Sequence, residues 1–259
     1  MTDEARVRAA TLRKSFAQIE RAARGVADPP SLKAALTRND VAVIAEVKRS
    51  SPSKGAINEK LDLGQQVSDY ERGGAAAISI LTEQTRFGGS NEDLVYARRY
   101  VSLPLLKKDF HVDPVQIFEA RSLGAAGALV IARAVEPSQL AVLVEAGRDC
   151  GLELVVEIRD ERELARALDA RAAIIGVNNR NLETLEIDPD TCVRMLPLIP
   201  RDVVAIAESG ITSSEDVEHL ASFGADAVLV GSMLSASANP EAGVRALTGI
   251  PRSPHARKG

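Results

Sequence analysis

Short apolar runs alternate with helix-like segments along nearly the whole chain, and this alternation constrains the fold more than any other feature of the sequence. The runs are rich in Val, Ile, Leu and Ala, as is typical of strands buried on both faces. Between them lie segments that begin with capping or first-turn residues, such as Ser213 with Asp216 three positions on. The runs are 41–45, Ala75–Leu81, Leu103–Leu106, Ala126–Ile131, Leu152–Val156, Ala172–Val177, Val203–Ala207 and Asp226–Val230. The clearest helical segments are Asp113–Leu123, Pro137–Cys150, Asp160–Leu168, Ser213–Phe223 and Pro240–Leu247.

Eight strand-like runs in a chain of 259 residues predict an α/β fold, a closed (β/α)8 TIM barrel. A doubly wound open sheet is the alternative, because strand counting from sequence is imperfect. We expect residues 41–250 to form the barrel as one catalytic domain and 1–40 an N-terminal helical extension. The basic, proline-containing stretch 251–259 is expected to be a disordered tail.

The extension carries its own helical signals. Residues 3–25 are rich in Ala, Arg, Glu and Gln and predict one amphipathic helix. A break follows near Asp28-Pro29-Pro30, and residues 31–37 predict a second, short helix. Because these elements precede the first strand, we expect a lid or a plug at the base of the barrel.

Composition excludes several classes of protein. The chain is 45% hydrophobic and 26% charged with a net charge of -4, which argues against a general nucleic-acid binder. No apolar run approaches the length of a membrane span, and the charged start is no signal peptide. Cys150 and Cys192 fit no metal or redox spacing, and three histidines make a metal site improbable. We expect a cytoplasmic protein that binds neither metal nor membrane.

The first run ends in charge. Glu46 and Lys48 share strand parity with Ala42 and Ile44, so the inner face passes from apolar to ionic at its carboxyl end. Buried charges are costly unless they pair with each other or serve a ligand. A structural ion pair that closes a barrel layer is the alternative interpretation.

Groups suited to acid–base work follow other runs as well, and the carboxyl ends of barrel strands are where active sites lie. Ammonium and carboxylate groups in one cavity shift one another's pKa values and divide into acid and base roles. Lys107 and Lys108 have opposite parity, so only one of them points inward, and the pattern leaves open which. A lysine that forms a Schiff base is a further possibility. The groups in question are Lys107, Lys108, Glu157, Asn178, Arg180 and Glu208.

The last two runs end in a second kind of signal. Ser209-Gly210 and Gly231-Ser232 offer backbone N–H groups unobstructed by side chains, where many barrels hold a phosphate. Glycines that only permit tight turns are the alternative. Because both loops carry the Gly/Ser pair, we predict a phosphate site.

Longer motifs surround these groups along the chain. They are E-V-K-R-S-S-P-S-K-G at 46–55, L-T-E-Q at 81–84, F-G-G-S at 87–90, L-L-K-K-D-F at 105–110, A-L-V-I-A at 128–132, V-E-I at 156–158, I-G-V-N-N-R-N-L at 175–182, A-E-S-G-I at 207–211 and V-L-V-G-S at 228–232. Taken together, in this order over about residues 41–235, they resemble the indole-3-glycerol phosphate synthase family of tryptophan biosynthesis.

The resemblance implies ring closure of 1-(2-carboxyphenylamino)-1-deoxyribulose 5-phosphate to indole-3-glycerol phosphate, with loss of carbon dioxide and water and without cofactor or metal. It implies that Lys108 is the general acid at the ribulose carbonyl and Glu157 the base. Lys48 would bind the substrate carboxylate and supply a second acid, Glu46 would orient the lysines, and Asn178 would bind near the departing hydroxyl.

The remaining implied contacts are to the substrate. Arg180 would pair with the anthranilate carboxylate, and Glu208 would contact substrate hydroxyls or hold a lysine. Ser51, Ser209, Gly210, Gly231 and Ser232 would line the substrate and phosphate pockets. Phe87, Phe110, Leu129, Ile131 and Leu182 would form an apolar bed for the ring, although Leu129 and Ile131 have barrel filling as their alternative.

Two features depart from the family pattern. Arg86 stands where many members carry an aromatic residue, and the extension has few large apolar residues for docking. There are three rival functions: a sugar-phosphate isomerase, a catalytically silent phosphate-binding barrel and a scaffold. The isomerase would use an Asp or Cys at the first strand, where this chain has Glu46 and Lys48. We expect a monofunctional enzyme, since this length holds no second barrel, and the family resemblance implies a monomer.

Overall fold

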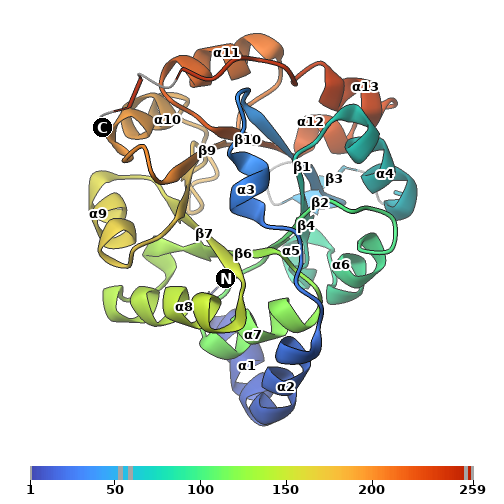
Figure 1. Ribbon diagram of the computed structural model, residues 1–259, viewed down its shortest axis with the longest axis vertical. Coiled ribbons are helices and arrows are strands. Elements are labelled where there is room, and N and C mark those ends of the chain that lie inside the picture. Colours follow the sequence, from blue (N-terminus) through green and yellow to red (C-terminus); the bar gives the residue numbers. More distant parts are fainter. Residues whose placement is uncertain (1, 52–54, 58–60, 254–255, 258–259) are drawn as a thin grey trace.

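A closed barrel of parallel strands, ringed by helices, forms the body of the protein (Figure 1). The structure is a computed structural model that describes residues 2–51, 55–57, 61–253 and 256–257. The strand order is β1-β10-β9-β8-β7-β6-β5-β4, so successive strands are neighbours and β1 closes the barrel against β10. The barrel strands are β1 (Ala42–Val47), β4 (Ala77–Leu81), β5 (Leu105–Lys108), β6 (Gly127–Ile131), β7 (Glu153–Ile158), β8 (Ile174–Asn178), β9 (Val204–Glu208) and β10 (Ala227–Val230).

The predicted (β/α)8 barrel is confirmed, and every predicted run overlaps a strand whose ends differ from those of the run by at most two residues. The open-sheet alternative is wrong, because β1 pairs with both β4 and β10. Side chains alternate along each strand between two apolar layers. In β1, Ala42 and Ile44 lie in the layer inside the barrel, whereas Val43 and Ala45 lie in the layer under the helices. Glu46 therefore points inward, as its parity predicts.

The helices that follow the strands form the outer layer, and their N-cap residues explain where each helix begins. Asp113, Asp160 and Ser213 each accept a backbone N–H of the helix that follows them, and Ser213 with Asp216 makes the predicted capping box. The outer helices are α4 (Leu63–Gly73), α6 (Asn91–Ala97), α7 (Pro114–Ser122), α8 (Pro137–Cys150), α9 (Glu161–Asp169), α10 (Asp190–Met195), α11 (Ser214–Ser222) and α13 (Pro240–Arg245). Shorter elements are α5 (Gln84–Phe87), α12 (Ser232–Ser235), the 3-10 turns Ala132–Ala134 and Leu196–Leu198, and a hairpin of β2 (Ser50–Ser51) and β3 (Gly55–Ala56).

The extension begins with two helices, α1 (Thr2–Arg13) and α2 (Phe16–Gly25), which lie beside α7 (Figure 1). The prediction of one helix over residues 3–25 is wrong, because the chain turns at Ser15. The turn lets the two helices meet different partners. The Phe16 ring packs edge-on against Phe118 of α7 with centroids 5.3 Å apart, while Arg8 and Arg13 of α1 form ion pairs with Asp109 and Asp113.

The third helix of the extension, α3 (Leu32–Leu36), lies across the end of the barrel in Figure 1. Leu32 and Leu36 are fully buried and join the apolar layer inside the barrel. Ser31 caps the helix and donates to Glu153 at the start of β7. The predicted short helix is confirmed, and it plugs the base of the barrel.

The tail after the barrel differs from the prediction of disorder at the residues that the structure describes. Arg252 and Arg257 both pair with Asp226, which is 3% exposed, and Arg257 also donates to the backbone oxygen of Val203 at 2.7 Å. A buried carboxylate needs such charge partners, and the tail supplies them. The basic composition that suggested disorder is what holds these two residues in place.

Among the residues described, no helix is both long and apolar enough to cross a membrane.

Candidate active site

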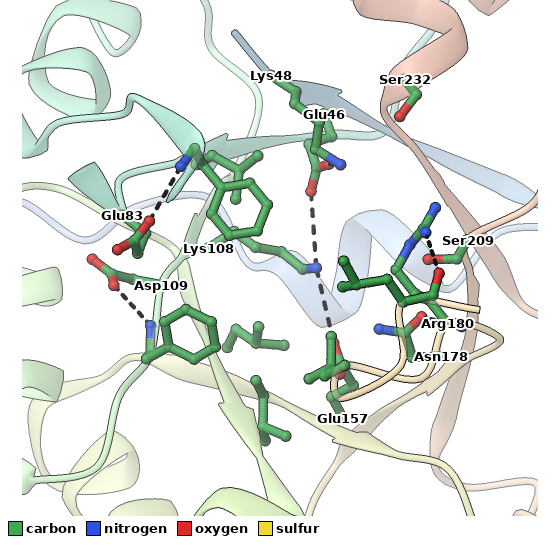
Figure 2. A pocket seen from close by; sticks show the side chains of 17 residues that line it. Glu46, Lys48, Glu83, Lys108, Asp109, Glu157, Asn178, Arg180, Ser209 and Ser232 are labelled. Atoms are coloured by element: carbon green, nitrogen blue, oxygen red, sulfur yellow. Dashed lines mark hydrogen bonds and ion pairs between the residues drawn. The ribbon is translucent and has the colours of Figure 1, made fainter. Parts of the chain in front are cut away.

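One cavity opens at the carboxyl ends of the barrel strands, where the sequence places the chemistry (Figure 2). Thirteen of the predicted site residues line it together. They are Glu46, Lys48, Phe87, Lys108, Phe110, Leu129, Ile131, Glu157, Asn178, Arg180, Leu182, Ser209 and Ser232. The cavity thus has an ionic floor, an apolar side and a rim of hydroxyl groups. Leu129 and Ile131, besides lining the cavity, belong to the apolar layer inside the barrel.

Lys108 stands at the centre of the floor. Its Nζ lies 3.1 Å from Glu208, 3.8 Å from Glu46 and 3.9 Å from Glu157, measured to carboxylate oxygens. Figure 2 shows the lysine reaching between Glu46 and Glu157. The structure shows which of the two adjacent lysines points into the cavity. Lys108 lines it, whereas Lys107 does not and pairs with Asp109 at 3.1 Å.

Glu46 binds a second lysine. The Lys48 Nζ lies 2.8 Å from a Glu46 carboxylate oxygen and 6.0 Å from the centre of the Phe87 ring. The backbone between the two residues is held as well, because the Ser235 hydroxyl donates to the Glu46 carbonyl at 2.9 Å and accepts the Lys48 N–H at 3.0 Å. The Tyr70 hydroxyl also donates to the Glu46 carbonyl, at 3.2 Å.

The charges in this cluster move one another's pKa values in different directions. Burial alone would raise the pKa of Glu46, but Lys48 and Lys108 lower it below its ordinary value. Burial opposes the charge on Lys108, yet Glu208, Glu46 and Glu157 together raise its pKa above the ordinary lysine value. Burial and the nearby Glu208 raise the pKa of Glu157 to about 7, although Lys108 opposes the shift.

These shifts assign the proton chemistry that the cluster can perform. Glu157 titrates near neutral pH, where a general base is most effective. Lys108 remains an ammonium ion, so it can donate a proton or stabilise negative charge. The same shift argues against the Schiff-base alternative, which needs a neutral amine.

Two glycines make room for the carboxylates. A Cβ at Gly231 would lie 2.4 Å from a Glu46 oxygen, and one at Gly176 would lie 2.3 Å from a Glu208 oxygen. Both distances are far below van der Waals contact. Gly231 was predicted to bind phosphate; in the structure it is packed beneath Glu46 and is not part of the cavity lining. Gly176 was not predicted at all.

The rim at the ends of β9 and β10 carries the predicted phosphate loops. Ser209 and Ser232 line the cavity, and Figure 2 places them on the side opposite Glu83 and Asp109. Ser209 has a positive φ of 69°, unusual for a residue with a side chain, and its carbonyl accepts from Asn179 at 3.1 Å.

Other predicted residues are held in specific ways. Gly210 continues the positive φ of Ser209 and packs near Ile187, outside the cavity lining. Glu208 lies beneath the floor with 1% exposure and reaches the cavity through Lys108. Arg180 donates to the Leu185 carbonyl at 2.8 Å.

Two further positions complete the comparison with the sequence. Ser51 lies in β2, and its side chain is outside the part of the chain that the structure describes. Arg86, where the sequence departs from the family pattern, is exposed and is not part of the cavity lining.

Four lining residues were missed. Asp109 and Glu83 stand inside motifs that were recognised, L-L-K-K-D-F and L-T-E-Q, so their position was a usable signal. Glu83 accepts the N–H groups of Thr85, Arg86 and Phe87 and so fixes the helix that carries Phe87. The other two, Leu81 and Leu185, carry no sequence signal beyond being apolar.

Within the described residues, no group of three or more His, Cys, Asp and Glu side chains is arranged to hold a metal ion.

The fold and the site define a (β/α)8-barrel protein with a cluster of ammonium and carboxylate groups in the cavity at the carboxyl ends of its strands. The likeness to solved structures supports the fold: thiamine phosphate pyrophosphorylase from Pyrococcus furiosus superposes with a TM-score of 0.61 at 14% identity, covering 84% of this chain and 96% of that one.

The sequence comparisons identify the particular family. Residues 2–247 match the family model described as indole-3-glycerol phosphate synthase. A protein of that name from Kineococcus radiotolerans is 52% identical over 204 residues, which are 79% of this chain and 74% of the relative. Another from Streptomyces griseus is 45% identical over 256 residues, which are 99% of this chain and 93% of the relative. The chain belongs to the indole-3-glycerol phosphate synthase family, whose members are lyases of tryptophan biosynthesis.

Proposed function

We propose that this protein closes the pyrrole ring of 1-(2-carboxyphenylamino)-1-deoxyribulose 5-phosphate and releases indole-3-glycerol phosphate, carbon dioxide and water. The observation that carries the proposal is the cluster around Lys108. It joins an ammonium held by three carboxylates to a glutamate whose pKa is raised to about 7, beside an apolar wall. Family membership supports the same reaction.

In the first step Lys108 acts as the general acid. It protonates the ketone oxygen of the ribulose chain as the ring carbon that bears the carboxylate attacks the carbonyl carbon. A new carbon–carbon bond forms, and the carbonyl becomes a hydroxyl group. Loss of carbon dioxide then returns the bonding electrons to the ring. An ammonium among carboxylates supports this role because it is charged and held in place.

In the second stage water leaves and the pyrrole forms. Lys48 protonates the departing hydroxyl, and Glu157 removes the proton from the neighbouring carbon. Asn178 binds near the departing hydroxyl and Glu46 orients both lysines. The 2.8 Å contact between Lys48 and Glu46 and the near-neutral pKa of Glu157 support this division. Proton transfers and two bond cleavages suffice, so the proposed reaction needs no cofactor.

The substrate spans the cavity from the apolar wall to the rim. Phe87, Phe110, Leu129, Ile131 and Leu182 contact the ring. Lys48 and Arg180 bind its carboxylate, a task that suits the planar guanidinium. Glu208 holds Lys108 in line with the carbonyl. The loops Ser209-Gly210 and Gly231-Ser232 bind the phosphate at the opposite end.

The test is a single-turnover and steady-state assay with this substrate, following indole fluorescence, on the parent protein and on Lys108→Ala. Lys14→Ala removes an exposed ammonium and is the matched control. We expect product from the parent and the control, and a rate at least about a hundredfold lower in Lys108→Ala. Equal rates in the parent and in Lys108→Ala would support the reaction but would assign the general acid to Lys48 instead. A parent that forms no product while binding a substrate analogue would support the silent barrel instead.

A further inference from the structure

The buried carboxylate of Asp109 joins the active-site cavity to the N-terminal extension. Asp109 follows Lys108 in the chain and lines the same cavity, yet its side chain is only 1% exposed. It accepts from the Thr82 hydroxyl at 2.8 Å, the Lys107 ammonium at 3.1 Å and the Phe110 N–H at 2.7 Å. The residues that flank it in the chain are the proposed acid, Lys108, and a proposed contact of the ring, Phe110.

Arg8 completes this set of partners from outside the barrel. The two terminal nitrogens of its guanidinium donate to the two oxygens of Asp109, at 2.5 and 3.0 Å. Such a bidentate pair fixes the plane of the carboxylate as well as its position. Arg8 belongs to α1, so the orientation of a group in the cavity wall depends on a helix that precedes the barrel.

Two cations, Lys107 and Arg8, share the negative charge of the Asp109 carboxylate. Burial would raise the pKa of Asp109, but Lys107 and Arg8 hold it well below its usual range. Lys107 supplies one positive charge, and the buried His111 beside it is held neutral because burial and Lys107 lower its pKa to about 3. Without Arg8, one oxygen of the buried Asp109 carboxylate would lose its strongest hydrogen-bond donor. The free-energy cost of this loss would favour a rearrangement of residues 108–110.

We propose that Arg8 is a positioning residue for the reaction: through Asp109 it sets the backbone of 108–110 and thereby the aim of Lys108 and Phe110. This inference rests on the roles proposed above for those two residues. Its physical basis is that a displacement of about 1 Å at a proton donor can lower a rate by about a hundredfold. Arg8 touches no substrate atom in this account.

The same helix supplies a matched control. Arg13, also on α1, pairs with Asp113, which caps α7 by accepting the Val115 N–H at 3.0 Å. Asp113 is not among the residues that line the cavity. Both arginines therefore tie α1 to the barrel, and Arg8 alone of the two ties it to the cavity wall.

The experiment compares Arg8→Ala with Arg13→Ala in the full-length protein, at a temperature where circular dichroism shows both folded. We expect kcat to fall about tenfold or more in Arg8→Ala with a smaller change in KM, and to stay within about twofold of the parent in Arg13→Ala. Millimolar guanidinium ion should raise kcat of Arg8→Ala but not that of the parent or of Arg13→Ala. Arg8 is partly exposed, so the ion can enter the space that its side chain leaves.

Equal losses in the two variants, or no rescue by guanidinium, would overturn the inference, since docking of α1 alone would then explain the result. Parent-like kcat in Arg8→Ala would overturn it as well and leave the proposed function intact. A parent protein without activity would overturn the proposed function and this inference with it.

Discussion

The Lys108 ammonium lies 3.1 Å from a carboxylate oxygen of Glu208, which is almost completely buried beneath it. Glu208 is close enough to hold the lysine and also close enough to Glu157 to raise the pKa of that carboxyl group. One buried carboxylate thus acts on both partners of the proposed proton transfers, keeping the acid charged and bringing the base near neutrality.

The pH dependence of the reaction should follow from this arrangement. Because Glu157 must be ionised to act as a base, kcat/KM should rise as pH increases through about 7, the pKa of Glu157. Glu208→Gln removes a negative neighbour, which lowers the pKa of Glu157 and moves the acidic limb to lower pH. The measurement is the profile of kcat/KM against pH for both proteins. An unmoved limb would show that another group controls it.

The glycines beneath the carboxylates give a steric prediction. Gly176→Ala places a Cβ 2.3 Å from Glu208 and Gly231→Ala one 2.4 Å from Glu46, so each carboxylate must move away from its lysine. We expect kcat to fall about tenfold or more in each variant. Gly25→Ala is the control, because its Cβ meets nothing within 4 Å. Activity equal to that of the control would mean that the carboxylates tolerate displacement.

The barrel was predictable because its signals repeat. Eight buried runs, each followed by a helical segment, leave few alternatives, and polar residues at the run ends indicate the site. The parity argument for Glu46 and Lys48 is also local, since it needs only the alternation of a strand. Such features depend on neighbours in sequence, which a single chain displays.

What could not be predicted depends on contacts between distant segments. The sequence does not distinguish Lys107 from Lys108, and only the structure shows that Lys107 pairs with Asp109 and Lys108 with Glu208. The docking of α1 and the order of the described tail residues depend on charge pairs with residues about a hundred and about thirty positions away in the chain, respectively. The role of Gly176 depends on Glu208 from the next strand, which no local pattern reveals.

Acid sensitivity should trace in part to His111. Its Nδ1 hydrogen-bonds the Leu129 carbonyl at 2.7 Å and must donate there, and burial lowers the pKa of the ring to about 3. The folded state therefore excludes a proton that the unfolded chain accepts below about pH 6.5, and stability is lost as pH falls.

The size of this effect can be measured by urea unfolding. Between pH 7 and pH 5 the parent should lose about 2 kcal/mol more unfolding free energy than His111→Gln, which has no such proton to exclude. His219→Gln, at an exposed histidine of α11, should behave like the parent. Identical losses in the parent and His111→Gln would show that His111 does not govern acid stability.

The two adjacent lysines of β5 should fail in opposite ways when their charge is removed. Lys107 is 2% exposed and pairs with the buried Asp109, so Lys107→Met leaves that carboxylate short of a charge partner and should cost about 3–5 kcal/mol of unfolding free energy. In Lys108→Met, Glu46 keeps Lys48 as a charge partner and Glu157 already takes up a proton near neutral pH. Only the buried Glu208 then loses its close partner, so the cost should be smaller. Activity shows the reverse order, because only Lys108 faces the proposed substrate.

Urea midpoints and kcat of the two variants provide the measurement. Adding Asp109→Asn to Lys107→Met should restore part of the lost stability by removing the uncompensated charge. A Lys107→Met protein as stable as the parent would mean that Arg8 alone neutralises Asp109 and that Lys107 is not needed for this.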